Sequence, residues 1–306
     1  MKPEKKYPMR LAKFRGGWMN MEPDLPVPDI DWIKSKILDI AYGSDPLQKL
    51  DVYYPDTDKE KHPVIIVIHG GGWSHMDKRD WHLYPSFFGL EKGFMVASVN
   101  YRLIPKHKSP SGINDCFAAV EYLVNNADHL KIDLSNVFIW GASAGGNLGT
   151  ITALKYSGDT RLRIRAMIAV APALDMKPLY DSLYDMLGNK KPGWLYKRLR
   201  PYFLRKLSKG HFGYVLDFEK TPVGFYDASY YLSGKAPKFY FQYGGKDTSI
   251  PPKTIEDFAG KLLRHGLSKE EIIFDCIEDA PHVGASHHFF EEEVVVRYIN
   301  YCAGLL

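Results

Sequence analysis

The chain has 306 residues, of which 45% are hydrophobic and 25% are charged. This length is normal for one α/β domain with an insertion, and the composition is that of an ordinary globular protein. The 40 basic and 36 acidic residues give a net charge of +4, which argues against a nucleic-acid binder that depends on bulk electrostatics. The cysteines Cys116, Cys276 and Cys302 are too few and too scattered for a disulfide framework or a zinc site. We expect Cys116 and Cys276 to be buried thiols.

The N-terminal segment is basic, with six Lys or Arg and one Glu in residues 1–15. No continuous apolar stretch follows it, so it does not have the pattern of a secretory signal. No uninterrupted apolar run approaches the length of about 20 residues that predicts a membrane-spanning helix. We interpret residues 1–37 as an N-terminal arm on a single domain that covers residues 1–306. A cytoplasmic, reduced enzyme is the default expectation.

Strand-like and helix-like segments alternate along the chain, which predicts a mostly parallel sheet flanked by helices. Residues 50–54 alternate in polarity as a half-buried strand does. Residues 64–68 are continuously apolar, which is typical of a central strand covered on both faces, and residues 94–99 are similar. A helix is predicted over 115–124, because its apolar residues fall on one stripe.

The alternation continues through a strand over 136–140 and a helix that begins at residue 143. The later elements are expected to be strands over 166–170, 238–243 and 272–277 and helices over 253–265 and about 289–302. Two helices and three strands in this order extend the same α/β pattern.

The alternation stops between about residues 174 and 232. Residues 190–211 hold eight Lys or Arg and no acid, and apolar residues recur every four positions from Leu195 to Leu207. This spacing indicates a helix with one apolar stripe. Because the stretch is inserted between two core strands, we expect a helical cap that closes over the sheet. A surface contact, including a contact with a second copy in a homodimer, is the alternative.

The candidate chemistry centres on the pentapeptide Gly141-Ala142-Ser143-Ala144-Gly145, which joins a predicted strand to a predicted helix. A serine on so sharp a turn stands exposed above the sheet, where its hydroxyl can attack a carbonyl. Side chains at the two glycines would collide with neighbouring backbone. An activated serine further requires a base, an acid that orients the base, and donors for the developing oxyanion.

The glycine-rich loop His69-Gly70-Gly71-Gly72-Trp73 directly follows the predicted central strand. Its glycines leave backbone N–H groups free to converge on a substrate oxygen. The N–H groups of Gly71 and Gly72, together with that of Ala144, are the candidate oxyanion hole. A flexible glycine turn is the other interpretation of this loop. His69 is interpreted as a residue that holds the loop and not as the catalytic base.

Asp247 is the candidate acid, because it lies just past the strand predicted over 238–243. A carboxylate there can face the same rim as the serine, since ligands bind at the carboxyl ends of parallel strands. An Asp that caps the following helix is the alternative, although Pro251 and Pro252 intervene. Glu278 and Asp279 are further acids, but they lie almost next to the candidate base and would orient it poorly.

His282 is the candidate base, because it follows the last predicted strand in a loop. The order Ser143, Asp247, His282 is the serine, acid, histidine order of one hydrolase fold. His287 and His288 compete for the role. They lie where the final helix is expected to begin, and packing at a helix start accounts for them more easily.

The chain resembles the α/β-hydrolase esterases and lipases of the hormone-sensitive-lipase-like and BD-FAE type. The matching pieces are residues 42–55, 69–73, 100–105, 141–147 and 244–247 and His282, which occur in family order across about residues 38–306. Two positions depart from the pattern. Ala142 stands where an acidic residue often precedes the nucleophile, and Val283-Gly284 stands where Gly-Phe often follows the histidine. The resemblance also identifies Arg102 and Asp115 as parts of a structural arginine network.

The resemblance implies an α/β-hydrolase fold with a cap and no metal or cofactor. It implies that Ser143, Asp247 and His282 hydrolyse carboxylic esters through an acyl-enzyme. A small-molecule ester with a short- to medium-chain acyl group is expected, because the insertion holds many aromatic residues that could close an apolar pocket (Tyr180, Tyr184, Trp194, Tyr196 and Phe203).

Other activities on the same fold are alternatives: a formamidase or arylformamidase, a carbohydrate acetyl or feruloyl esterase, or a peptidase. A non-catalytic small-molecule receptor is disfavoured because both the serine and the histidine are present. A dinucleotide-binding fold is disfavoured because no G-x-G-x-x-G follows the first strand.

Overall fold

The computed structural model describes residues 6–7, 9–13, 24–179, 225–283 and 287–306. The strands are β1 (Met9–Lys13), β2 (Asp24–Pro28), β3 (Lys36–Ala41), β4 (Lys49–Tyr53), β5 (His62–Ile68), β6 (Met95–Val99), β7 (Ile132–Ala142), β8 (Ile164–Val170), β9 (Lys238–Gly244) and β10 (Ile272–Ile277). The α-helices are α1 (Phe87–Glu91), α2 (Ser111–Asn125), α3 (Ala144–Tyr156), α6 (Pro252–Arg264) and α7 (Glu292–Ala303). Short 3₁₀ helices are η1 (Trp81–Ser86), η2 (Ala228–Tyr231), η3 (Lys269–Glu271) and η4 (His287–Phe290).

The main sheet has eight strands in the order β10-β9-β8-β7-β5-β6-β4-β3. Its pairings from β10 to β6 are parallel, and β4 and β3 are antiparallel additions at one edge. The predicted, mostly parallel sheet is therefore confirmed. After β5 the chain first adds β6 on one side and then β7 on the other. In parallel sheets, ligands bind beyond the carboxyl ends of the strands at such a change of direction.

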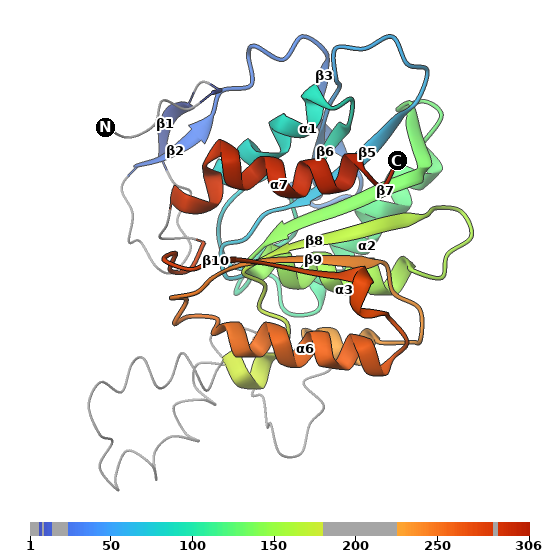
Figure 1. Ribbon diagram of the computed structural model, residues 1–306. Coiled ribbons are helices and arrows are strands. Elements are labelled where there is room, and N and C mark those ends of the chain that lie inside the picture. The colour runs from blue at the N-terminus through green and yellow to red at the C-terminus, as the bar shows by residue number, and fades with distance from the viewer. Residues whose placement is uncertain (1–5, 8, 14–23, 180–224, 284–286) are drawn as a thin grey trace, which may run out of the picture.

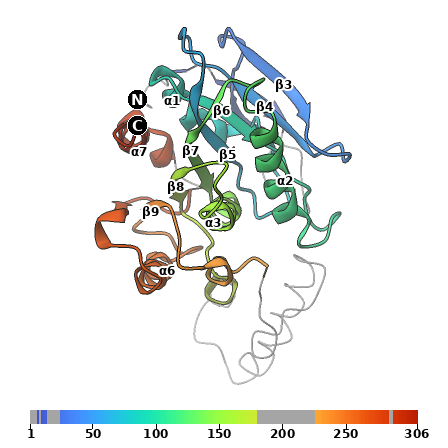
Figure 2. The same ribbon diagram turned by 90° about the vertical axis from the view of Figure 1, so that its right-hand side faces the viewer.

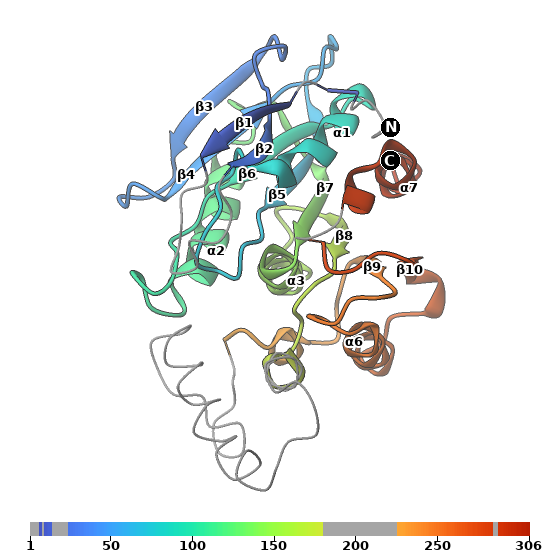
Figure 3. The same cartoon turned by 90° about the vertical axis from the view of Figure 1, so that its left-hand side faces the viewer.

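Helices cover both faces of the main sheet (Figures 1 and 2). Helices α1 and α7 lie on one face, and α2, α3 and α6 lie on the other, an arrangement that Figure 3 shows from the side opposite to that of Figure 2. Strand β5 is buried along its whole length. Ile66 and Ile68 pack into the core beneath α2 and α3, whereas Ile65 and Val67 pack into the core beneath α1 and α7. Burial on both faces is the reason that this strand is continuously apolar.

Most predicted elements match the structure within a few residues, but some features do not. The helix predicted from residue 115 begins at Ser111, and β1, β2, β3 and α1 were not predicted. The half-buried character expected for residues 50–54 is wrong, because Asp51 is fully buried. Its carboxylate accepts a hydrogen bond of 2.9 Å from the Arg79 guanidinium, and such a charged partner is what permits a buried carboxylate.

Cys276 is exposed, so the expectation that it is a buried thiol is wrong, whereas Cys116 is buried as expected. The reason is the position of β10 at the edge of the sheet, where exposed and partly buried residues alternate.

Residues 180–224 of the predicted cap (174–232) lie outside the described residues, and so do the aromatic residues that were expected to close the pocket. The described start of the predicted arm (1–37) includes Tyr7, which is 6% exposed and packs edge-on against Phe87 and Phe88. Within the described ranges, no helix combines the length and the apolar character needed to cross a bilayer.

Candidate active site

Ser143 occupies a sharp turn between β7, which ends at Ala142, and α3, which begins at Ala144. Its backbone has φ 53° and ψ −119°, a conformation that costs a residue with a side chain on the order of 1–3 kcal/mol. Two hydrogen bonds hold the turn: the Ser143 N–H donates to the carbonyl of Val170 over 2.8 Å, and the Asn147 N–H donates to the carbonyl of Ser143 over 3.1 Å. The strand-to-helix turn predicted from the pentapeptide is therefore present.

The two glycines of the pentapeptide allow this turn to pack tightly. A Cβ at Gly145 would collide with the carbonyl oxygens of Ile68 and His69, at the end of β5. A Cβ at Gly141 would collide with the carbonyl of Gly145. Any side chain at these positions would push α3 away from the sheet, so the glycines bring Ser143 next to the loop that follows β5.

His282 lies between Ser143 and Asp247 and forms a hydrogen bond with each. Its Nε2 atom is 3.0 Å from Ser143 Oγ, and its Nδ1 atom is 2.7 Å from Asp247 Oδ2. The Asp247 side chain is fully buried, whereas the His282 side chain is 19% exposed. The three predicted residues come from the ends of β7, β9 and β10 and meet at the carboxyl edge of the sheet.

The second oxygen of Asp247 fixes the orientation of its carboxylate. Oδ1 accepts backbone N–H groups from Ser249, over 2.9 Å, and from Ile250, over 2.8 Å. An ionised carboxylate only accepts hydrogen bonds, so the proton between Asp247 and His282 lies on Nδ1. The Nε2 atom of the neutral imidazole is then an acceptor that faces the Ser143 hydroxyl.

The other acids and histidines considered from the sequence occupy different surroundings. Asp279 forms an ion pair of 2.5 Å with Lys246, and its side chain is 81% exposed. His288 Nδ1 is 3.5 Å from a carboxylate oxygen of Glu291. The side chain of His287 lies outside the described part of the structure.

The loop after β5 has the conformation that its glycines permit. Gly71 and Gly72 have φ values of 93° and 56°. Within the described residues, their N–H groups and that of Ala144 donate no hydrogen bond, so all three donors are available to a ligand. A Cβ at Gly70 would lie 2.8 Å from the carbonyl oxygen of Ala142, so this loop lies directly against the Ser143 turn.

His69 is buried at the base of this loop. Its ring stacks on Tyr101 with centroids 4.4 Å apart, and its Nδ1 atom donates to the carbonyl of Gly70 over 3.0 Å. Burial lowers the pKa of His69, which favours the neutral ring. The Tyr101 hydroxyl donates to the carbonyls of both His69 and Gly70. These contacts agree with the expectation that His69 holds the loop.

The arginine network expected from the sequence is present on the next loop. The Arg102 guanidinium donates to both oxygens of the buried Asp115 carboxylate over 2.8–3.1 Å. The Arg102 backbone N–H and the Gln48 amide donate to the same carboxylate. This network joins the loop after β6 to α2 and contributes no group to the Ser143 turn.

The described segments on either side of residues 180–224 are joined by a polar cluster, which sequence reasoning missed. The Ser229 hydroxyl donates to Asp175 over 2.7 Å, and the Lys261 ammonium contacts both Asp175, over 2.7 Å, and Ser229, over 2.8 Å. Asp227 accepts the Met176 N–H over 2.6 Å. None of these residues belongs to a sequence motif, and only their positions at the two ends of the insertion could have suggested a contact.

Burial raises the pKa of Asp227 from 3.8 to about 6. A raised carboxyl pKa means that the folded state binds the proton more tightly, so the free energy of unfolding falls as the pH rises from about 4 to 6. Asp227→Asn removes this penalty and keeps an oxygen for the Met176 N–H. We expect the variant to be more stable at pH 7.5 by about 1–3 kcal/mol and similar at pH 4. Thermal melts at both pH values measure this difference, and an equal gain at both would contradict it.

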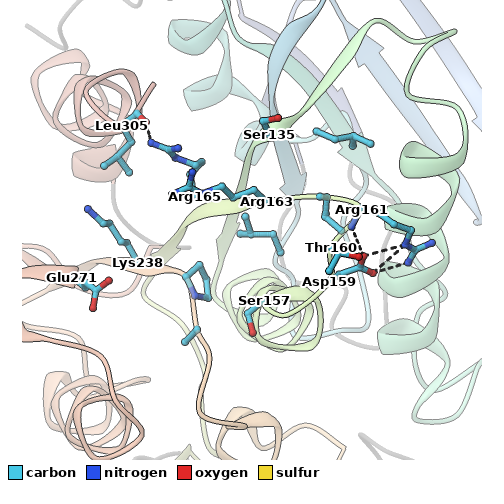
Figure 4. A pocket seen from close by; sticks show the side chains of 15 residues that line it. Ser135, Ser157, Asp159, Thr160, Arg161, Arg163, Arg165, Lys238, Glu271 and Leu305 are labelled. Carbon is cyan, nitrogen blue, oxygen red and sulfur yellow. Dashed lines mark hydrogen bonds and ion pairs between the residues drawn. The ribbon is translucent and has the colours of Figure 1, made fainter.

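A pocket of about 620 Å³ lies at the opposite ends of the strands (Figure 4). Arg163, Arg165, Lys238 and Glu271 are among the residues that line it, at the starts of β8, β9 and β10. It includes none of the candidate site residues. No group of three or more His, Cys, Asp or Glu that could hold a metal ion occurs in the ranges that the structure describes.

Three known proteins illustrate the similarity of the chain to other proteins. Carboxylesterase NlhH of Mycobacterium tuberculosis is 38% identical over 149 residues, which are 47% of this chain and 44% of NlhH. The chain thus spans less than half the length of this curated relative. A truncated carbohydrate esterase from gut microbiota has a TM-score of 0.71 at 19% identity and covers 91% of this chain and 99% of its own. A bacterial heroin esterase has a TM-score of 0.64 at 24% identity, and the match covers 89% of this chain and 82% of the esterase chain.

The sequence model of the BD-FAE family matches residues 50–262, which include Ser143, Asp247 and the glycine-rich loop. His282 lies beyond the matched range, and its place in the site comes from the hydrogen bonds described above. The order of the sheet and the structural similarities agree on one architecture. The chain has the α/β-hydrolase fold and belongs to the BD-FAE family.

Proposed function

We propose that the protein is a serine esterase that hydrolyses carboxylic esters through an acyl-enzyme formed on Ser143. The observation that carries this proposal is the continuous hydrogen-bond chain from Ser143 Oγ through His282 to Asp247, with distances of 3.0 and 2.7 Å. A neutral imidazole with its proton on Nδ1 is ready to accept the serine proton at Nε2. This arrangement activates a hydroxyl that is otherwise a weak nucleophile.

In the acylation step, Ser143 Oγ attacks the ester carbonyl carbon while its proton passes to His282 Nε2. The imidazolium is stabilised by the Asp247 carboxylate. When the tetrahedral intermediate collapses, the bond to the alkoxy oxygen breaks and His282 returns the proton to the leaving alcohol. Water then attacks the acyl-enzyme by the same proton transfers in the deacylation step and releases the acid.

The negative charge of the tetrahedral intermediate requires donors that are already in place. We assign this role to the N–H groups of Gly71, Gly72 and Ala144. Each lies on the loop or turn beside Ser143, and each is free of other hydrogen bonds among the described residues. Preorganised donors of this kind contribute a large share of catalysis in acyl transfer.

The names of related proteins are consistent with this proposal. NlhH is named a carboxylesterase, and a protein of Saccharolobus solfataricus that is 31% identical over 119 residues is named an arylesterase. We further propose a small-molecule ester with a short- to medium-chain acyl group as substrate, on the basis of the aromatic insertion. The unpaired Cys116, Cys276 and Cys302 support a reducing, cytoplasmic location. The near balance of charge gives no support to a nucleic-acid partner, and a homodimer contact through the insertion stays a prediction.

A panel of p-nitrophenyl esters tests the reaction and the substrate class together. We expect kcat/KM to be highest between acetate and octanoate and at least about tenfold lower for palmitate, because a pocket closed by an aromatic cap would not admit a long acyl chain. Formyl amides, acetylated sugars and aminoacyl amides are the comparison substrates. Faster turnover of any of these than of the best simple ester would contradict the proposed substrate class. The absence of a fluorophosphonate adduct on Ser143 in intact-mass measurements would contradict the mechanism itself.

A further inference from the structure

Tyr226 belongs to none of the sequence motifs, but it packs against the glycine-rich loop that carries the candidate oxyanion donors. Its ring meets that of Trp73 edge to face, with centroids 5.3 Å apart and an interplanar angle of 64°. Tyr226 is 2% exposed and Trp73 is 5% exposed. We propose that Tyr226 is a positioning residue: it holds Trp73 and, through it, keeps the N–H groups of Gly71 and Gly72 aimed at the oxyanion. This inference rests on the proposed function.

The loop has a conformation that needs external support. Gly71, Gly72 and Trp73 follow one another with φ values of 93°, 56° and 59°. Glycine adopts positive φ freely, but for a residue with a side chain this region costs about 1–2 kcal/mol. Such a conformation persists only where neighbouring groups fix it. The Ile104 N–H donates to the Trp73 carbonyl over 3.0 Å and fixes its backbone, and Tyr226 contacts its side chain.

Tyr226 can act as a support because its carbonyl and the residue that follows it are each held by a hydrogen bond. The Asn147 side-chain amide donates to the Tyr226 carbonyl over 2.7 Å, and Asn147 is fully buried in the first turn of α3, just after Ser143. The next residue, Asp227, accepts the Met176 N–H, as described above. Tyr226 therefore connects the helix that follows the nucleophile, through its carbonyl, to the loop that carries two oxyanion donors, through its ring.

A positioning role and a purely structural role predict different kinetics. Oxyanion donors act on charge that develops in the transition state, so a misplaced loop lowers kcat and changes KM little. Removal of one such donor costs about 100- to 1,000-fold in kcat, and an error of about 1 Å in position costs about 100-fold. A buried aromatic residue that only stabilises the fold would change the melting temperature and leave kcat per folded molecule intact.

The test compares Tyr226→Leu with Tyr226→Phe and with Tyr298→Leu. Tyr298 is the matched control, because it is 1% exposed in α7 on the opposite face of the sheet. With p-nitrophenyl acetate, we expect Tyr226→Leu to lower kcat about 10- to 100-fold, with KM within about threefold. Tyr226→Phe keeps the ring and should stay within about threefold in both constants. Tyr298→Leu should lower the melting temperature about as much as Tyr226→Leu does, but its kcat should equal that of the parent.

Two further measurements keep the result decisive. Trp73→Leu removes the same contact from the loop side, so it should lower kcat to a similar extent, and the double variant should lose no more than the worse single variant. The rate of Ser143 labelling by a fluorophosphonate should fall in parallel, because phosphonylation places negative charge in the same position.

Normal kcat in folded Tyr226→Leu, or in Trp73→Leu if the first variant does not fold, would overturn the inference. So would an equal loss of kcat in Tyr298→Leu. If the unmodified protein labels at Ser143 and hydrolyses esters, such results overturn only the role of Tyr226. If the unmodified protein neither labels nor hydrolyses esters, the proposed function fails and this inference fails with it.

Discussion

Ser143→Ala is expected to lower kcat for p-nitrophenyl acetate by at least about 10⁴-fold. The alanine methyl group cannot form an acyl-enzyme, and His282 loses the hydroxyl that it deprotonates. The remaining rate would come from water that attacks an ester held by the backbone N–H groups. Steady-state kinetics on purified protein, corrected for spontaneous hydrolysis, measure the change.

Ser157→Ala is the matched control for this variant. Ser157 lies at the other end of α3, where its hydroxyl donates to the carbonyls of Leu154 and Lys235 over 2.9 and 2.8 Å. We expect its kcat to stay within about twofold of the parent, since the residue lies away from the reacting groups. The melting temperature of Ser143→Ala should stay close to that of the parent, because both residues carry a Cβ at the same positive φ. More than a tenth of the parent activity in Ser143→Ala would show that another group is the nucleophile.

Much of the fold could be predicted because the central elements have strong local signals. Residues 64–68 are apolar on every position, and the structure places them in β5, covered on both faces. The Ser143 pentapeptide, placed between an apolar run and a helical pattern, is typical of one sharp strand-to-helix turn, and the structure has that turn. The signal is strong because burial on two faces and close backbone approach each exclude most residue types.

The features that sequence reasoning missed have weak local signals or depend on partners that lie elsewhere in the chain. Strand β3 has the pattern of exposure of an edge strand, so no apolar run marks it. The alternating pattern predicted that Asp51 faces solvent, but its hydrogen bond with the Arg79 guanidinium permits the carboxylate to be buried. No periodicity in residues 49–53 encodes that partner, which lies on a loop after β5.

In the candidate site, likewise, some residues could be predicted from the sequence and others could not. The chemistry of Ser143, Asp247 and His282 follows from residue type and from position after a strand. The residues that support the site do not follow from either. Asn147 could be recognised as part of the motif, but its contact with the Tyr226 carbonyl joins positions that are 79 residues apart. Tertiary contacts of this kind have no local pattern, so only a structure identifies them.

Asp247→Asn is expected to lower kcat by about 10⁴-fold, although the substitution changes only one atom and one charge. In the folded protein, Oδ1 accepts two backbone N–H groups, from Ser249 and Ile250. An amide NH₂ cannot replace that oxygen, because it would face two donors. The Asn carbonyl must therefore take the Oδ1 position, and the NH₂ group must take the place of Oδ2, opposite His282 Nδ1.

That orientation of the Asn side chain forces the imidazole of His282 into the other tautomer. Opposite an NH₂ donor, Nδ1 of His282 must accept, so the imidazole proton moves to Nε2 and points at Ser143 Oγ. A protonated Nε2 cannot accept the proton of the serine hydroxyl. ¹⁵N NMR of His282 should show this change of tautomer, with little change in melting temperature. Asp279→Asn is the matched control: it removes an exposed acid three residues from His282 whose ion pair with Lys246 contributes little, so kcat should be unchanged. A large loss in Asp279→Asn, or normal turnover in Asp247→Asn with the proton still on Nδ1, would mean that another carboxylate orients the base.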